Sequence, residues 1–509
     1  MGHPLFRRKT LDAILHEAEA PDRHLKRALG GFDVVMLGIG AIIGSGIFAT
    51  IGTAVAGDAM RAGAGPAIVV SFALTAVACA FCGLCYAEFA SLVPISGSAY
   101  TYSYATLGEL VAWIIGWDLI IEYAVGNVAV AIAWASYFRQ LCDGLGVHIP
   151  AWLAVDYRSA LQAAGDAAGA PAVDPATALA HEAWTAHPVV AGVPLIFNAL
   201  AVLIVMLITW LLVVGVKESA RANNVMVAIK LVILCFFIYS GAKFVKPANW
   251  SPFMPNGFSG VWVGASLIFF AYIGFDAIST AAEECRNPAR DLPIGIIGSL
   301  VICTVIYVAV ALVLTGMVPW THLGVADPLA AAFAYVGANV SAGIVSVGAV
   351  VSMSAVLLVF QYGQPRIFFS MSRDGLLPPH FSAVHPKHRT PHVTTIWTGV
   401  VVAAVSAIAN INEIVELTNI GTLFAFILVC AGVIILRRRE PHRPRAFRTP
   451  LVPLVPLLGI ASCLYLIMGL PAVTMWRFVI WLAVGMVVYF AYGYRKSALA
   501  RSQSAVRES

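Results

Sequence analysis

Lys230 is the residue whose type and position most directly suggest chemistry. It lies in the apolar run Val227-Ala-Ile-Lys-Leu-Val-Ile-Leu234, beyond Arg221. The separation from Arg221 corresponds to about 13 Å of helical rise, which places Lys230 near the centre of a bilayer. A lysine at that depth must pair with an acceptor or lose its proton. It could therefore bind and release a proton, or it could be a permanently charged lysine that ties helices together.

Two glycine-rich or irregular stretches suggest interrupted helices. Gly38, Gly40, Gly44 and Gly46 fall within nine residues, and a second irregular stretch is Ala271-Tyr-Ile-Gly-Phe-Asp276. Gly is poor in a helix interior, so these stretches predict breaks that expose backbone N–H and C=O groups. In a membrane, such groups must face a polar solute or other protein groups. The alternative for the first stretch is close helix packing through its small-xxx-small pattern.

The elements that must position these residues are membrane-spanning helices. Of the 509 residues, 60% are hydrophobic and only 11% are charged, well below the charged fraction of soluble domains. The apolar residues form runs of the length that crosses a bilayer. We predict an all-α polytopic membrane protein with about twelve transmembrane helices, at 32–57, 66–92, 106–138, 194–215, 222–245, 260–282, 294–318, 340–370, 393–411, 415–436, 451–472 and 476–494.

The distribution of basic residues predicts the topology. With the N-terminus cytoplasmic, 24 of the 31 Lys and Arg residues lie on the cytoplasmic side and six on the outer side, as the positive-inside rule requires. We expect a cytoplasmic segment at 1–30, one transporter domain at 31–495 with an outward, partly helical loop at 139–192, and a cytoplasmic tail at 496–509. The location expected is the inner or plasma membrane, with both termini cytoplasmic.

Other site types find little support in the sequence. Cys79, Cys82 and Cys85 share one helix face and could bind a soft metal, but we expect them to be small packing residues, since we expect no histidine or fourth cysteine nearby. We predict no metal site, no cofactor and no catalytic residues. No Walker loop is present to hydrolyse ATP, and basic runs directly after a span indicate topology rather than nucleic acid binding.

Four ordered motifs resemble the amino acid–polyamine–organocation superfamily, most closely its cationic amino acid transporter branch and the bacterial relatives of that branch. The resemblance covers about 30 to 495, apart from the 139–192 loop. The motifs are Gly40-Ala-Ile-Ile-Gly-Ser-Gly-Ile-Phe48, Pro94-Ile-Ser-Gly-Ser-Ala-Tyr-Thr-Tyr102, Ala271 to Ala277 continuing to Glu283-Glu284, and Gly363 to Leu377.

This resemblance implies a leucine-transporter-like fold of two inverted five-helix repeats plus two further helices, with a midplane substrate site. Helix-end dipoles suit the two charged groups of an amino acid. The substrate carboxylate is expected at the first break and the α-ammonium at carbonyls of the sixth-span break. The residues expected to form this site are Ile43, Gly44, Ser45 and Gly46 at the first break and Phe270, Ala271 and Ile273 at the second.

The resemblance also gives roles to Lys230 and Phe360. In proton-coupled relatives an equivalent of Lys230 occupies a sodium position, so its ammonium would bridge carbonyls near Gly40 and Ile43 to Ser352 or Ser354 of the eighth span.

Glu122 would favour a cationic substrate, and Phe360 would favour smaller, neutral ones. This conflict stays open, because Glu122 could instead pair with Asp118 and Phe360 could simply pack. Phe275 could close over the substrate or pack in the core.

The function expected is proton-coupled import of neutral or cationic L-amino acids by alternating access. The alternatives are an amino acid or polyamine exchanger without net proton coupling, and an amino acid sensor with a transporter-like fold. The expected partners are the amino acid, protons and the lipid bilayer. The sequence leaves open whether a sterol or a small membrane subunit also binds between helices.

Overall fold

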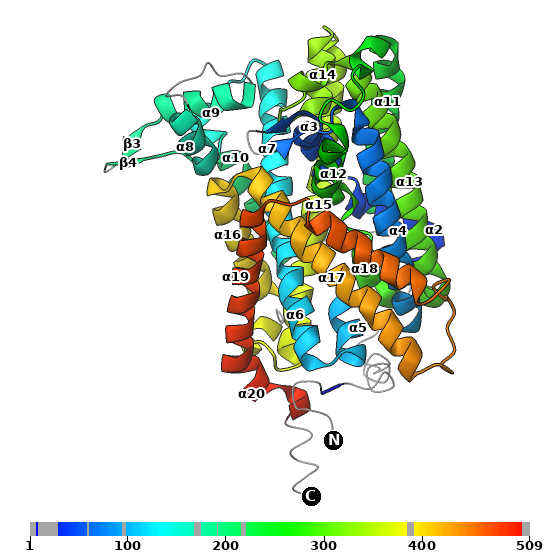
Figure 1. The fold of residues 1–509 in the computed structure, drawn as a ribbon. Helices are drawn as coiled ribbons and strands as arrows, with labels where there is room; N and C mark the ends of the chain where they lie inside the picture. Colours follow the sequence, from blue (N-terminus) through cyan, green and yellow to red (C-terminus); the bar gives the residue numbers. More distant parts are fainter. Residues whose placement is uncertain are drawn as a thin grey trace, which may run out of the picture.

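Helices make up nearly all the regular structure of this protein (Figure 1). The computed structural model describes residues 7–8, 29–58, 61–93, 98–166, 175–190, 192–214, 220–383 and 391–500. Within these ranges the strands form two short antiparallel hairpins, β1 (Gly57–Asp58) with β2 (Arg61–Ala62), and β3 (Val189–Val190) with β4 (Val193–Pro194). The predicted all-α class is confirmed.

Long apolar helices build the body of the bundle. The helix α13 packs against α2 and α4, and α15 packs against α7 and α11. A π-helical turn, η5 (Ile121–Val125), joins α6 to α7, so the third predicted span is one continuous helical segment. The long elements are α4 (Ile68–Leu92), α6 (Glu109–Ile120), α7 (Gly126–Gly144), α11 (Ala220–Gly241), α13 (Pro288–Met317), α15 (Asn339–Arg373), α17 (Ile411–Arg439) and α19 (Ala472–Val488).

Shorter elements complete the bundle and its two ends. The shorter α-helices are α5 (Ser98–Thr106), α8 (Tyr157–Asp166), α9 (Pro175–Thr185), α10 (Ala199–Val214), α14 (Pro328–Tyr335), α16 (His392–Ile408), α18 (Leu454–Ile467) and α20 (Tyr494–Lys496). Single turns are η4 (Gly65–Ala67), η6 (Ala151–Leu153), η7 (Ala242–Phe244), η8 (Pro247–Trp250), η11 (Trp320–His322), η12 (Pro379–Ser382) and η13 (Tyr489–Gly493).

The first predicted span is broken where its glycines cluster. The helix α2 (Gly31–Ile42) ends at Ile43, whose backbone is extended, and the chain resumes as the π-helical turn η3 (Gly46–Thr50) and α3 (Ile51–Ala56). The two halves are bent by 42°. The predicted break is confirmed. The alternative, close helix packing through small residues, also holds in part, because a Cβ on Gly38 would lie 2.5 Å from the side chain of Ile278.

The sixth predicted span is broken as well. The helix α12 (Gly257–Ile268) tightens into the 3₁₀ turn η9 (Phe269–Tyr272), the chain extends at Ile273, and the 3₁₀ segment η10 (Ala277–Glu284) follows. Gly274 has a φ of +118°, a conformation that side chains disfavour. Both breaks therefore occur where the sequence predicts them.

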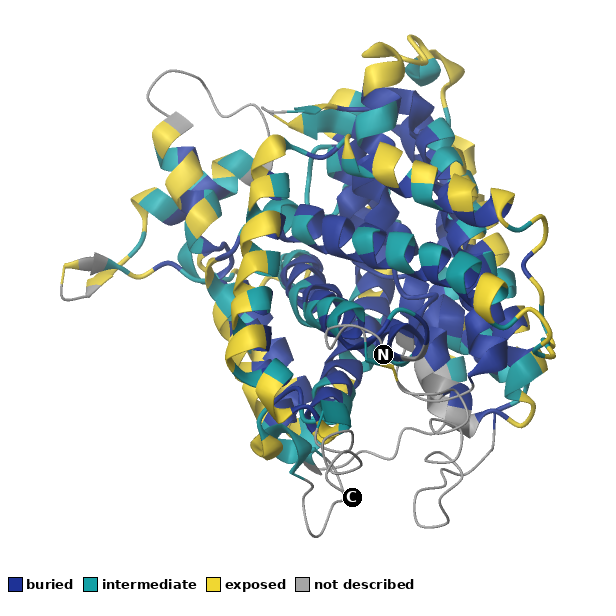
Figure 2. Cartoon of the chain, turned by 60° about the horizontal axis from the view of Figure 1, so that its bottom comes forward, coloured by how far each residue is buried: buried dark blue, intermediate teal, exposed yellow. Residues whose placement is uncertain are grey.

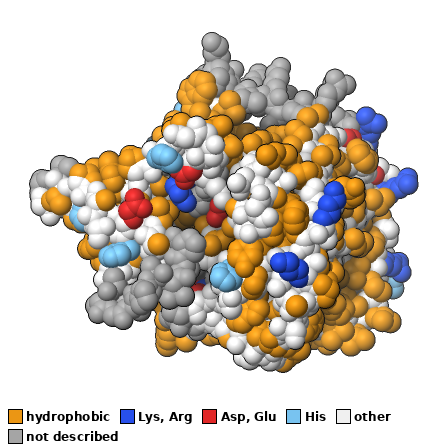
Figure 3. All heavy atoms as spheres, turned by 90° about the horizontal axis from the view of Figure 1, so that it is seen from above, with side chains coloured by type: hydrophobic (Ala, Val, Ile, Leu, Met, Phe, Trp, Pro, Cys, Tyr) orange, Lys and Arg blue, Asp and Glu red, His pale blue; other side chains and the backbone are white. Residues whose placement is uncertain are grey.

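The outer surface of the bundle is apolar. Side chains that face lipid need not be polar. Large hydrophobic side chains project outward from α10, α11, α13, α16 and α19. Figure 2 shows exposed residues along the outside of the bundle and buried ones toward its centre. Seen from above, hydrophobic side chains also cover much of the face, with only scattered charged ones (Figure 3). This surface is that of a multi-pass membrane protein.

The number of crossings can be compared with the twelve predicted. The described residues contain eight helices long and apolar enough to span a membrane, one bent pair that could act as a further span, and three shorter apolar helices at Ala199–Val213, His392–Ile408 and Leu454–Ile467. These elements match the twelve predicted runs in position. Whether each of them crosses the membrane stays a prediction, as does the orientation of the termini.

The 139–192 loop is partly helical, as predicted. Its helices α8 and α9 project with β3 and β4 from one side of the bundle (Figure 1) and share a small alanine-rich core of their own. Asp156 begins α8 by accepting hydrogen bonds from the Ser159 backbone N–H at 2.8 Å and from the Ser159 hydroxyl at 2.7 Å. Burial raises the pKa of the Asp156 carboxyl to about 6.

We expect Asp156→Ala to destabilise the folded 139–192 loop by about 1 kcal/mol, because the first turn of α8 loses its N-terminal cap. Asp156→Asn keeps an acceptor and is the matched control. Since the folded-state pKa of Asp156 lies above that of an unfolded aspartate, the wild type should gain stability relative to Asp156→Asn as the pH falls from about 7 to about 4. Thermal unfolding in detergent at several pH values measures both effects. A pH-independent difference would contradict the second.

Candidate functional site

The two helix breaks cross each other at the centre of the bundle. A Cβ on Gly46 would lie only 2.3 Å from Ala271 Cα, and one on Gly274 would lie 2.8 Å from Ala41 O. No side chain fits at either place. The glycines therefore allow the backbone of the first break to lie directly against that of the sixth-span break.

Tyr307 of α13 connects the two breaks through its hydroxyl group. Its Oη lies 3.1 Å from Ile42 O and 2.9 Å from Ala271 O, and the residue is fully buried. A helix break leaves carbonyl groups without intrahelical partners, and this hydroxyl supplies a donor to that region. The sequence analysis missed Tyr307. The available signal was a tyrosine in the middle of a long apolar run.

The residues expected to bind the substrate carboxylate lie on the non-helical backbone of the first break. Ser45 is buried, and its hydroxyl has no partner among the described residues. The space beside Gly44 faces the methyl groups of Val356, with 3.0 Å between a Cβ built on Gly44 and Val356 Cγ2. Ile43 is fully buried. A free hydroxyl and an irregular backbone suit a polar ligand, but the binding role of these residues stays a prediction.

The residues expected at the sixth-span break are also buried at the crossing. Phe270 and Ala271 belong to η9, and Ile273 follows in an extended conformation with φ −60° and ψ 140°. Phe275 packs between Tyr86, at 5.8 Å between ring centroids, and Phe426, at 5.0 Å. This packing is the alternative that the sequence analysis gave for Phe275, and its role as a lid stays a prediction.

Lys230 of α11 reaches the first break. It is fully buried, and its Nζ donates hydrogen bonds to Gly40 O at 2.9 Å and Ile43 O at 3.0 Å. Ser352 of α15 donates to the same Ile43 oxygen at 3.3 Å. Among the ion pairs of the described residues, none involves Lys230. Both hydrogen bonds of the amine to the described residues therefore go to carbonyl groups.

The structure decides between the two serines named with Lys230. Ser354 Oγ donates to Val350 O at 2.8 Å and accepts from Trp134 Nε1 at 2.9 Å. It is therefore engaged with α15 and α7. Ser352, two residues earlier on α15, is the serine that shares a carbonyl with Lys230.

Glu122 lies on the π-helical turn η5, and Phe360 lies on α15. The ring of Phe360 packs on Tyr123, with 5.6 Å between centroids, and lies beside Gly126. The Glu122 carboxyl is buried. The alternative in which Glu122 pairs with Asp118 is not formed, because the Asp118 carboxyl has no hydrogen-bond partner among the described residues. Single π turns recur at functional sites.

The cysteines of α4 are less isolated than the sequence suggested. Cys82 Sγ lies 3.4 Å from Cys463 Sγ and 3.9 Å from Cys430 Sγ. The expectation that no further cysteine lies nearby is therefore wrong, since folding brings α17 and α18 to α4. All nine cysteines are free thiols.

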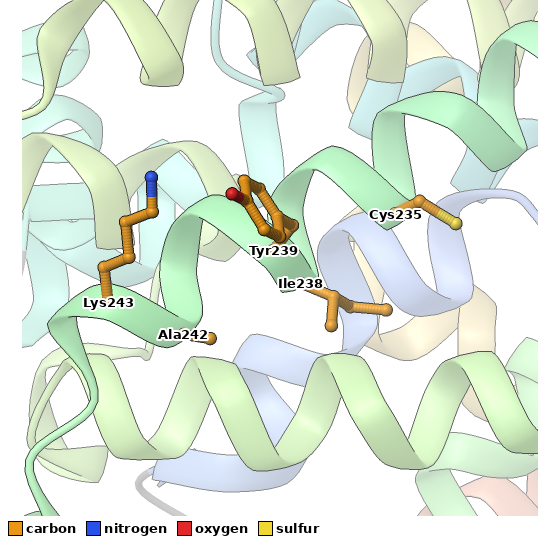
Figure 4. Close-up of a pocket in the computed structure, with 5 residues that line it drawn as sticks. All are labelled: Cys235, Ile238, Tyr239, Ala242 and Lys243. Atoms are coloured by element: carbon orange, nitrogen blue, oxygen red, sulfur yellow. The ribbon is translucent and has the colours of Figure 1, made fainter.

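Two hollows on the surface of the described bundle contain none of the residues at the helix breaks. A groove of about 590 Å³ runs along α11 and η7 and is lined by Cys235, Ile238, Tyr239, Ala242 and Lys243 (Figure 4). A second, of about 450 Å³, lies between α2 and α11. Neither contains a residue predicted to bind substrate. The buried crossing of the breaks is therefore the better candidate site.

Comparisons with known proteins agree with this arrangement. A family model described as amino acid permease matches residues 29–492. The chain is 47% identical to the branched-chain amino acid permease BcaP of Bacillus subtilis, over 98% of this chain and 100% of that protein. It is 46% identical to the methylthioribose transporter of Bacillus subtilis, over 97% and 99%. It is 39% identical to the chloroplastic cationic amino acid transporter 9 of Arabidopsis thaliana, over 82% and 67%.

We expect Gly46→Ala to lower substrate uptake by at least about tenfold, because the added methyl group must push the two breaks apart and small misplacements at a site are costly. Gly343→Ala is the control, since Gly343 of α15 has open space around its Cβ position. Initial uptake rates in liposomes, compared at equal amounts of folded protein, give the result. Wild-type uptake by Gly46→Ala would show that the contact with Ala271 is dispensable.

Proposed function

Because this chain belongs to the amino acid permease family, we propose that it imports amino acids across the plasma membrane together with protons, by alternating access. The observation that carries the proposal is the contact of Lys230 with Gly40 O and Ile43 O at the first helix break. This contact joins Lys230, the one buried amine of the described spans, to the backbone that would bind the substrate.

The two breaks supply complementary groups for the charged ends of an amino acid. Backbone N–H groups at the start of η3, near Gly46, attract a carboxylate, and carbonyl groups at the end of η9 attract an ammonium. The unpartnered hydroxyl of Ser45 adds a donor on the carboxylate side. The close crossing of Gly46 and Ala271 supports one ligand that touches both breaks at once.

The surroundings of Lys230 suit a group that gains and loses a proton. A neutral amine has two N–H donors and an ammonium has three. Two carbonyl oxygens accept from Nζ, so both hydrogen bonds survive deprotonation. Protonation adds a positive charge against the carbonyl end of α2 and strengthens its attraction to that helix end. In this proposal the proton on Lys230 stabilises the form of the first break that holds substrate.

The proposed substrates are neutral amino acids with aliphatic side chains. The space beside Gly44 ends at the methyl groups of Val356, and Phe360 fills volume near Gly126. One relative of nearly full-length coverage is named for branched-chain amino acids, which supports the same class.

We expect Lys230→Ala to lose the stimulation of uptake by an inward proton gradient while it retains exchange of labelled for unlabelled substrate. The reason is that substrate would still meet the two breaks, but no amine would carry the proton. Purified protein in liposomes, with and without an imposed pH gradient, provides the measurement.

Lys243→Ala is the matched control, because Lys243 follows α11 and stacks over Tyr239 at 4.9 Å, away from the breaks. Undiminished stimulation by the gradient in Lys230→Ala would refute the coupling role. If the wild type exchanges substrate but never responds to a gradient, the exchanger alternative is correct. Binding without any flux would indicate a sensor.

We expect leucine, isoleucine and valine to be transported in preference to lysine and arginine. Phe360→Ala should shift the preference toward bulkier side chains, because a large ring is removed beside Tyr123. Phe368→Ala, on the same helix but packed against Phe381, should leave the preference unchanged. A panel of radiolabelled amino acids and methylthioribose in liposomes is the measurement, and preferred uptake of methylthioribose or arginine would overturn the substrate class.

A further inference from the structure

The last turn of α12, directly before the sixth-span break, is held by a side chain from another span. Asn419 of α17 donates from Nδ2 to Ser266 O at 2.9 Å and to Leu267 O at 3.0 Å. After these residues the backbone changes from α-helical to 3₁₀ hydrogen bonding in η9, and such a change leaves a carbonyl group without its regular partner. Asn419 therefore supplies donors at the point where the helix itself ceases to supply them.

The burial of Asn419 indicates that this contact is specific. The residue is fully buried, and its Oδ1 has no hydrogen-bond partner among the described residues. An unpaired amide oxygen away from water is costly, and an apolar side chain of similar size would avoid that cost. The two carbonyl groups also fix the orientation of the amide, since only its nitrogen can donate. What asparagine adds at this position is thus a pair of N–H groups directed at α12.

The carbonyl groups on either side of this contact are held as well. Thr75 of α4 donates to Ala265 O at 3.0 Å, and the hydroxyl of Tyr307 lies 2.9 Å from Ala271 O. Asn419 holds two carbonyl groups between them. Successive carbonyl groups lie at different angles around a helix axis, so contacts to several of them fix the rotation and the tilt of the helix end. The direction of the remaining carbonyl groups of η9 follows from these contacts.

The helix that carries Asn419 contacts both broken spans. Phe426, two turns after Asn419 on α17, packs on Phe269 of η9 with 5.8 Å between ring centroids. Glu416, one turn before Asn419, accepts from Arg61 Nη1 at 2.5 Å, and Arg61 lies just after α3 of the first span. Asn419 therefore projects from a helix that is fastened to the outer parts of both breaks.

We propose that Asn419 positions the substrate-binding carbonyl groups of the sixth-span break: its amide holds the end of α12 so that the carbonyl groups of Phe270 and Ile273 point at the substrate ammonium. Asn419 is a positioning residue, because it acts through the backbone. The proposal rests on the transport function proposed above and assigns to α17 a part in recognising one end of the amino acid. A misdirected carbonyl weakens a charge-assisted hydrogen bond, and small errors in such geometry are costly.

The experiment separates the two charged ends of the substrate. Binding of radiolabelled leucine to the purified full-length protein in liposomes is competed with leucic acid, in which a hydroxyl group replaces the ammonium, and with leucinol, in which a hydroxymethyl group replaces the carboxylate. Asn419→Leu should bind leucine about tenfold more weakly. Its affinity for leucic acid should not change, so the preference for leucine over leucic acid falls by the same factor. The preference for leucine over leucinol should stay that of the wild type, because both ligands carry the ammonium.

Thr418→Val is the matched control, because Thr418 precedes Asn419, is equally buried, and donates to Ile414 O of its own helix at 2.8 Å. Both preferences should be those of the wild type in this control. Equal weakening of all three ligands in Asn419→Leu would indicate general damage to the fold and would overturn the positioning role. An unchanged affinity for leucine would overturn it too.

A second variant keeps the proposal testable if Asn419→Leu does not fold. Asn419→Ser retains a polar side chain, but its single O–H can donate to only one carbonyl group at a time. The preference for leucine over leucic acid should therefore fall while the preference over leucinol is retained, and wild-type selectivity would contradict the proposal. Binding of no amino acid by the wild type would overturn the proposed function and this proposal with it. Wild-type binding with unchanged selectivity in both variants would overturn this proposal alone.

Discussion

The carbonyl groups exposed at two helix breaks must be satisfied where lipid offers no hydrogen bonds, and the arrangement at the centre of this protein follows from that constraint. Side chains from three different helices meet the need. Lys230 donates to Gly40 O and Ile43 O, Ser352 donates to Ile43 O, and Tyr307 lies against Ile42 O and Ala271 O. The breaks are therefore held in place by α11, α13 and α15.

The same polar side chains make the centre able to respond to charge. When a titratable donor such as an amine satisfies a carbonyl group away from water, its attraction to that carbonyl changes as it gains or loses a proton, because the interior screens charge weakly. Lys230 at the first break is the clearest example.

Ion pairs fasten the ends of the bundle, where water is nearer. Arg61, just after α3, pairs with Glu416 of α17 at 2.5 Å and also with Asp58. Near the other end of α4, the buried carboxylate of Glu88 accepts from Arg437 and Arg445 and from the Thr449 backbone N–H. In both cases α17 is tied to an element that follows a break or packs beside one. Buried pairs of this kind are costly to separate, so they restrain how α3 and α4 move against α17.

The sequence by itself determined the membrane character, the positions of the helices and both breaks, because hydrophobic run length and glycine in helix interiors act locally. It also indicated the family, which the match over residues 29–492 confirms, and it singled out Lys230. Only the tertiary structure decided which groups meet. Three contacts join residues far apart in the chain: Tyr307 at the two breaks, Ser352 rather than Ser354 beside Ile43, and Cys463 against Cys82. Such contacts depend on how helices pack and rotate against each other, and a sequence pattern that describes each helix alone does not contain that information.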